Sequence, residues 1–214
     1  MKSAWLLAPL ALFFTCEAYA ANPTFVQGVN YVSISPAQPT DVKPGQIEVI
    51  EFFWYGCPHC FRVEPSLEAW LKSKPKDVVF RRIPGAMPGS EFYTDAQAFY
   101  TAQVLGIGAK IHEPLFNAIH LKGNVALASD KGALRIFFGK YGVSAQDFDA
   151  AWDSFTVHTR MAEAAQVEGR YGINGVPTFV IDGKWMTGAG YGMPETEIMN
   201  CVDYLVRKDR AAMK

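Results

Sequence analysis

The stretch that organises the chain runs Ile47-Glu48-Val49-Ile50-Glu51-Phe52-Phe53-Trp54-Tyr55-Gly56-Cys57-Pro58-His59-Cys60. Its first nine residues are apolar on both alternating faces except at two glutamates, a pattern typical of a strand buried inside a sheet. A helical pattern follows over 61–72, and Pro58 suits the first turn of that helix because its missing N–H is not needed there. Cys57 is therefore predicted to lie at the carboxyl end of a buried strand, where open α/β sheets place their chemistry.

Two cysteines at this spacing, on a strand-to-helix turn, can close a small disulfide and open it again. One alternative is half of a zinc site, but zinc usually takes four ligands, and the sequence holds no second Cys-x-x-Cys or His-x-x-x-His pair. Another is a static structural bond, although a disulfide that closes so small a loop constrains the unfolded chain little. The pattern favours redox chemistry at Cys57 and Cys60 and predicts neither a metal ion nor another cofactor.

The composition limits the classes of function. The 214 residues, half of them hydrophobic, suit one globular domain or one domain with a large insertion. The formal net charge of −1 gives no support for nucleic acid as a partner.

The first twenty residues carry the features of a secretory signal peptide. A lysine follows the first methionine, 4–14 is apolar, and Ala18-Tyr19-Ala20 has the pattern of a cleavage site. We predict cleavage after Ala20; an uncleaved membrane anchor is the alternative, although the apolar core is short for a membrane span. Export to an oxidising compartment suits a reversible disulfide. The odd cysteine of the mature chain, Cys201, is expected to be a buried, inert thiol rather than a regulatory one.

Two further β-rich runs flank a long helical block. The run 78–83 follows the first helix, so the two strands around that helix are predicted to be parallel. From 90 to about 170 apolar residues recur at helical spacing without a flexible linker, which predicts an insertion packed on the sheet. The β pattern returns at 176–181, before the hairpin signal Asp182-Gly183 and a short partner strand at 184–187. The remaining predicted elements are a strand over 29–34 and a last helix that opens at Pro194.

These features together resemble the thioredoxin superfamily, and within it the DsbA family of periplasmic thiol:disulfide oxidoreductases. The residues that carry the resemblance are Glu51-Phe52-Phe53, Cys57-Pro58-His59-Cys60 and Gly175-Val176-Pro177-Thr178, and the match covers essentially the whole mature chain. The resemblance implies an α/β thioredoxin-like fold with an inserted all-helical domain. The predicted division is a signal peptide at 1–20, a first part of the thioredoxin-like domain at 21–87, the helical insertion at 88–170 and a second part at 171–214.

The resemblance also implies an activity and its partners. The protein is expected to introduce disulfide bonds into unfolded or folding exported proteins in the periplasm, by exchange with their cysteine thiols. A quinone-linked membrane enzyme of the DsbB type is the implied partner that reoxidises it. A disulfide isomerase or reductase is the alternative, but 21–46 is too short for the dimerisation domain usual in such isomerases, so we expect a monomer.

Each cysteine has a predicted role. At a helix N-terminus the Cys57 sulfur faces unpaired N–H groups and the positive end of the helix dipole, and both favour the thiolate. A stabilised thiolate favours the reduced protein, so the disulfide becomes a stronger oxidant, a relation for which DsbA is itself the known example. Cys60, one turn into the helix, is expected to be less exposed, to leave when substrate attacks Cys57 and to resolve unproductive mixed disulfides.

Residues around the cysteines are candidates for tuning them. Pro58 shapes the turn, and His59 can assist the thiolate by charge or hydrogen bonding, unless it is merely an exposed imidazole. Burial should raise the pKa of Glu51, which could then take a proton from Cys60 through water. The alternative for Glu51 is a structural ion pair with Arg81 or Arg82.

The resemblance implies that Pro177, preceded by Val176, is a cis proline. Its loop would pack against the active-site disulfide and pair through its backbone with an extended substrate. A trans proline at the start of a strand is the alternative. The other histidines of the chain are expected to be ordinary helix residues: His112, His120 and His158.

Overall fold

The computed structural model describes residues 24–213. The predicted signal peptide at 1–20 lies outside these residues. Within 24–213, no helix combines the length and apolarity that crossing a membrane requires.

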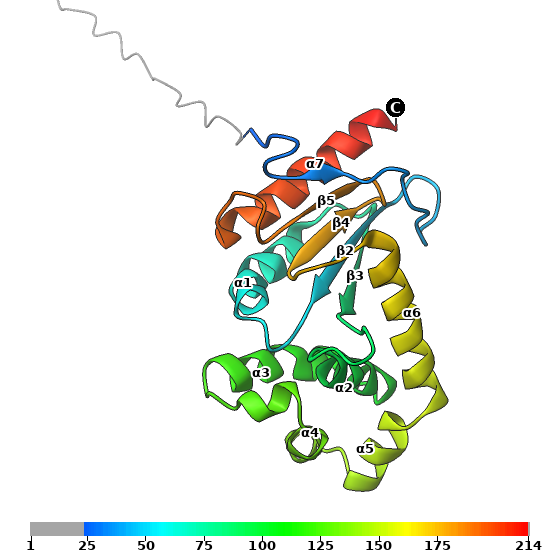
Figure 1. Cartoon of the computed structure of the whole chain (residues 1–214), viewed down its shortest axis with the longest axis vertical. Helices are drawn as coiled ribbons and strands as arrows, with labels where there is room; N and C mark the ends of the chain where they lie inside the picture. Colours follow the sequence, from blue (N-terminus) through cyan, green and yellow to red (C-terminus); the bar gives the residue numbers. More distant parts are fainter. Residues whose placement is uncertain (1–23, 214) are drawn as a thin grey trace, which may run out of the picture.

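The centre of the fold is a five-stranded sheet with strand order β1-β5-β4-β2-β3 (Figure 1). Its strands are β1 (Val32–Ser33), β2 (Ile47–Phe53), β3 (Val78–Pro84), β4 (Thr178–Ile181) and β5 (Trp185–Gly188). Strand β2 lies between parallel β3 and antiparallel β4, and all of its residues are buried. The predicted buried strand and its parallel pairing are thus confirmed.

Helices surround the sheet and form a block at one end of it. Helix α1 (Pro58–Ser73) joins β2 to β3, and α7 (Ile198–Ala212) follows a short 3-10 turn, η2 (Glu195–Glu197). Figure 1 shows α2 to α5 gathered beyond the carboxyl end of β2, whereas α6 runs back beside the sheet. The elements between β3 and β4 are α2 (Tyr93–Val104), α3 (Gly108–His120), the 3-10 turn η1 (Val125–Ala128), α4 (Lys131–Gly139), α5 (Ala145–Trp152) and α6 (Phe155–Tyr171).

The alternation of β2 residues divides the core between two faces. Val49 belongs to a cluster with Leu67 of α1 and Val202 of α7. Phe52 belongs to the cluster that includes the helical block, and its ring lies 6.0 Å from that of Tyr171 at the end of α6. Because both faces are covered, the end of β2 emerges where the sheet, α1 and the helical block meet.

Several predicted boundaries differ from the structure, three of them for a clear physical reason. The strand expected over 29–34 is reduced to β1 because residues 26–31 close a turn on themselves, with the Gly28 N–H donating to the Tyr31 carbonyl. Strand β4 begins at Thr178 because Pro177 has no N–H for the sheet ladder. The last helix begins at Ile198, because residues 195–197 first form the η2 turn. The hairpin turn is as predicted, with positive φ angles of 50° and 63° at Asp182 and Gly183.

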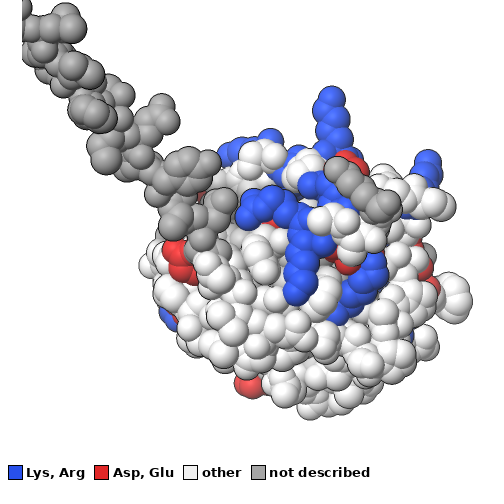
Figure 2. All heavy atoms as spheres, turned by 90° about the horizontal axis from the view of Figure 1, so that it is seen from above, with Lys and Arg blue, Asp and Glu red and all other residues white. Residues whose placement is uncertain are grey.

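The end of the molecule at which α7 terminates is rich in basic side chains. Figure 2 views this end and shows Lys and Arg gathered there, with acidic groups among them. Arg210 of α7 forms two hydrogen bonds to Asp77, and the Lys208 ammonium lies over the Tyr31 and Trp185 rings. Cations in the last turns of a helix interact favourably with its dipole, so these residues stabilise the end of α7.

Candidate active site

Cys57 is the N-cap residue of α1, and its thiol is almost fully buried. Its Sγ accepts the Cys60 N–H at 3.4 Å and lies 3.5 Å from the Val176 carbonyl oxygen, to which the thiol can donate. The pKa of Cys57 is lowered to about 6, first by a hydrogen bond from the Cys60 side chain, and also by two helix N–H groups and the charge of His59. Burial opposes this shift but does not cancel it. The reduced protein therefore carries Cys57 largely as thiolate at neutral pH.

Cys60 is fully buried one turn into α1. Burial raises its pKa well above the usual value, and the hydrogen bond with Cys57 and the charge of Cys57 raise it further. Both cysteines are free thiols in the structure. Because the two pKa values move apart, the reduced pair loses one proton near neutral pH and keeps the other. Among residues 24–213, no group of three or more His, Cys, Asp or Glu side chains is placed to hold a metal ion.

The loop before β4 lies against the active-site sulfur. The Val176–Pro177 peptide bond is cis, as predicted, and the Val176 carbonyl faces Cys57. The Pro177 carbonyl accepts the Ala189 N–H at 3.0 Å, so the hairpin holds this loop from behind. Gly188 packs so closely on the Pro177 carbonyl that no side chain would fit.

The side chain of His59 is half-exposed but not free. Its Nδ1 lies 2.7 Å from Oε1 of Glu195, and Arg62 Nη2 lies 2.8 Å from both of these atoms. The hydrogen bonds from Arg62 and then His59 lower the pKa of Glu195 to about 2. Glu195 could not be predicted from the sequence as a partner of His59, because 136 positions separate the two residues and no motif connects them.

Glu51 is fully buried and paired with Arg82 of the neighbouring strand. The β2–β3 register places Glu51 opposite Arg82, and the Arg82 Nε to Glu51 Oε2 distance is 3.0 Å. Arg82 Nη2 also contacts Glu64 at 3.3 Å and Glu68 at 2.8 Å. Burial and the charge of Glu64 raise the pKa of Glu51 to about 8, although Arg82 acts in the opposite direction. Glu51 therefore holds its proton to a higher pH than an exposed carboxyl does, and where it is ionised its charge raises the pKa of Cys60.

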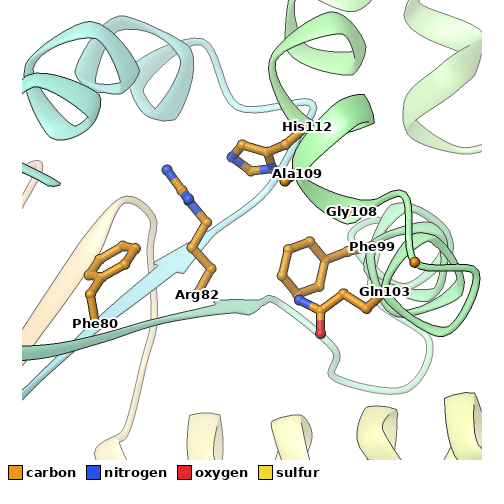
Figure 3. A pocket seen from close by; sticks show the side chains of 8 residues that line it. Phe80, Arg82, Phe99, Gln103, Gly108, Ala109 and His112 are labelled. Carbon is orange, nitrogen blue, oxygen red and sulfur yellow. The ribbon is translucent and has the colours of Figure 1, made fainter. Parts of the chain in front are cut away.

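A hollow of about 470 Å³ opens beside this network, where β3 meets α2 and α3. Figure 3 shows the end of the Arg82 side chain near the His112 ring at this hollow, with Phe99 below them in this view. His112 Nδ1 hydrogen-bonds the Tyr55 hydroxyl at 2.7 Å, and its Nε2 lies 3.5 Å from Glu64. His112 was expected to be an ordinary helix residue, and this prediction is wrong because the ring links the helical block to the buried carboxylates.

The helical block also holds the loop that precedes Cys57. Asp95 of α2 is fully buried and accepts the Gly56 N–H at 3.3 Å. His120 of α3 donates from Nε2 to the Tyr55 carbonyl at 2.7 Å, so it too is not an ordinary helix residue. The role of Asp95 could not be predicted from the sequence, because a single carboxylate within the apolar pattern of α2 does not indicate which residue it contacts.

This chain is similar to a known protein family and to several named proteins. The family described as DSBA-like thioredoxin domain matches residues 82–195, a range that begins after the two cysteines. The thiol:disulfide interchange protein DsbA of Pseudomonas syringae pv. tomato is 39% identical over 204 residues, which cover 95% of this chain and 93% of the relative. The protein of the same name from Pseudomonas aeruginosa is 35% identical over 214 residues, the full length of both chains.

Solved structures show the same similarity. The crystal structure of Pseudomonas aeruginosa DsbA superposes with a TM-score of 0.79 at 35% identity, covering 88% of this chain and 96% of that one. The oxidoreductase DsbA of Xylella fastidiosa has a TM-score of 0.78 at 33% identity, covering 89% and 99%. The thioredoxin-like fold and the resemblance inferred from the motifs are thus confirmed over nearly the whole chain.

Proposed function

Because this chain belongs to the DsbA family of thioredoxin-like thiol:disulfide oxidoreductases, we propose that Cys57 and Cys60 are its redox-active pair. The observation that carries this assignment is the opposite displacement of two neighbouring thiol pKa values, to about 6 at Cys57 and well upward at Cys60. A thiolate stabilised in the reduced protein makes the corresponding disulfide a good oxidant. The pair is therefore suited to donate its disulfide rather than to keep it.

The proposed reaction consists of two exchanges. A substrate thiolate attacks Sγ of Cys57 in the oxidised protein, a mixed disulfide forms, and Cys60 leaves with the electron pair of the broken S–S bond. A second substrate thiolate then attacks the substrate sulfur of the mixed disulfide, and Cys57 leaves as thiolate. The substrate loses two electrons and gains a disulfide, and the Cys57–Cys60 pair gains these electrons.

The surrounding residues have proposed supporting roles. Glu51 exchanges a proton with Cys60 through water, which its buried position and raised pKa support. Pro58 starts the helix whose N–H groups face Cys57, and His59 adds positive charge. The cis Val176–Pro177 loop receives an extended substrate beside Cys57, a role that the position of the Val176 carbonyl supports.

We place this reaction in the periplasm, after cleavage of the signal peptide behind Ala20. Folding exported proteins with free thiols are the proposed substrates, and a quinone-linked membrane enzyme of the DsbB type is the proposed reoxidant. The division at 21–87, 88–170 and 171–214 is proposed as two parts of a thioredoxin-like domain and one insertion in a monomer. It is supported by the run of helices between β3 and β4.

The test is disulfide donation to a reduced, unfolded protein that has two cysteines. One equivalent of the oxidised protein should oxidise about one equivalent of this substrate, whereas the reduced protein should repair a scrambled substrate poorly. Thiol loss in the substrate and its regained activity give the readout. Efficient repair of the scrambled substrate with poor oxidation of the reduced one would instead identify an isomerase.

A further inference from the structure

Glu195 lies on the η2 turn, which follows the β4–β5 hairpin, yet its carboxylate reaches the first turn of α1. We propose that Glu195 is a positioning residue of the active site, which holds the His59 ring through Nδ1 beside Cys57 and offsets the charge of Arg62 there. The inference rests on the proposed function of Cys57 as the exchanging cysteine. It adds a residue that does not touch the reacting sulfur and acts on it through His59.

Three atoms form the core of this arrangement. His59 Nδ1 and Glu195 Oε1 are 2.7 Å apart, and Arg62 Nη2 lies 2.8 Å from each. A protonated ring donates Nδ1–H to the carboxylate, and a neutral ring can accept from Arg62 at the same nitrogen. The Nδ1 edge of the ring is therefore held in both protonation states, while the guanidinium keeps its bond to Glu195.

The charges of this cluster determine the direction of the effect. The carboxylate of Glu195, with a pKa lowered to about 2, is ionised at neutral pH. It offsets the positive charge of the Arg62 guanidinium. The net charge of the three groups His59, Arg62 and Glu195 therefore equals the charge of the His59 ring. These are the charged groups that the described structure places against the ring, Arg62 from α1 and Glu195 from η2.

Loss of the Glu195 carboxylate would leave the positive charge of Arg62 without an opposite charge beside His59. The Arg62 guanidinium would then lie 2.8 Å from Nδ1 with no carboxylate beside either group, and it would repel a positively charged ring from its position beside Cys57. The positive charge of His59 is one of the causes that favour the Cys57 thiolate. The Cys57 thiol should therefore hold its proton to higher pH when Glu195 is neutral.

Solvent limits the size of the effect. The side chains of His59 and Arg62 are 52% and 49% exposed, and that of Glu195 is 29% exposed. Exposed ion pairs contribute about 0.2–1 kcal/mol, which corresponds to roughly 0.2–0.7 pKa units. The expected change is thus a shift of this size and not a loss of function.

The test compares Glu195→Gln with Glu197→Gln in the full mature protein. Glu197 lies on the same turn and loses the same charge, but its carboxylate accepts from Asn200 and does not contact His59. Thiolate absorbance against pH gives the Cys57 pKa, and mixtures of reduced and oxidised glutathione give the redox equilibrium. Glu195→Gln should raise this pKa by about 0.2–0.7 units and shift the equilibrium toward the disulfide by roughly 1.5- to 5-fold. Glu197→Gln should have the wild-type Cys57 pKa and equilibrium. Adding Arg62→Gln to Glu195→Gln should bring both quantities back toward the wild-type values.

The outcomes separate this inference from the proposed function. If Glu195→Gln has the Cys57 pKa and equilibrium of Glu197→Gln, or changes only the unfolding free energy, the positioning role is wrong. If the double variant of Glu195→Gln and Arg62→Gln has a Cys57 pKa as high as that of Glu195→Gln alone, the proposed effect of the Arg62 charge is wrong. If the wild-type pair does not exchange with glutathione at all, it is the proposed function that is wrong.

Discussion

Replacing Cys57 by serine is expected to abolish disulfide donation. The hydroxyl cannot form a disulfide with Cys60, so no bond remains for a substrate thiolate to attack. Cys60 is fully buried and its raised pKa keeps it protonated, so it cannot take over the exchange. The measurement is oxidation of a reduced two-cysteine protein by Cys57→Ser after treatment with an oxidant.

The matched control is Cys201→Ala, which removes the third described cysteine. Cys201 is buried in α7, where its sulfur accepts from the Thr187 hydroxyl at 3.5 Å and burial raises its pKa. The predicted buried position is confirmed, and the variant should keep the wild-type rate of donation. Measurable donation by Cys57→Ser, or its loss in Cys201→Ala, would contradict the assignment of the redox pair.

Replacing Arg82 by methionine is expected to destabilise the protein by about 3–5 kcal/mol at pH 8 and above, where Glu51 is ionised, the usual cost of leaving a buried ion pair without one partner. Arg82 is the cation that contacts buried Glu51 together with Glu64 and Glu68. Methionine fills much of the same space but cannot donate to these carboxylates. Urea unfolding monitored by tryptophan fluorescence gives the difference in unfolding free energy.

The pH dependence gives this prediction a second readout. In the folded protein the pKa of Glu51 is raised from 4.5 to about 8, so the folded state binds a proton that the unfolded chain releases. Stability from this group therefore falls as pH rises through that interval. Arg82 lowers this pKa, so its removal extends the fall to higher pH, and Arg82→Met should be more destabilising near pH 8 than near pH 5.

Arg207→Met is the control for the loss of an arginine. Arg207 pairs with Asp203 on the exposed side of α7, and such a pair is worth about 0.3–0.5 kcal/mol. A loss of similar size in Arg82→Met, or one that does not change with pH, would show that the buried carboxylates do not depend on Arg82.

The parts of the fold that the sequence predicts are those with local causes. The continuous apolar run before Cys57 predicts β2, and Asp182-Gly183 predicts the hairpin because both residues adopt the positive φ that this turn needs. The placement of Cys57 at a helix N-terminus follows from the same local pattern. The direction of its pKa shift could therefore be inferred before the structure.

The remaining features depend on how distant segments meet. The choice between Arg81 and Arg82 as partner of Glu51 is set by the strand register, which composition does not encode. Asp95 and Glu195 come from α2 and η2, and only the packing of these elements brings them to the loop and helix around the cysteines. Polar residues that join segments through single contacts thus leave no periodic trace in the sequence.

The central claim is that the Cys57 thiolate makes the Cys57–Cys60 disulfide an oxidant, and the redox equilibrium with glutathione tests it most directly. The mature protein is equilibrated with a series of reduced and oxidised glutathione mixtures, and the reduced fraction is measured after acid quenching and thiol labelling. We predict that the reduced form dominates even when oxidised glutathione is in excess. A disulfide that persists in excess reduced glutathione would contradict the account, because it would belong to a reductase or to a structural bond.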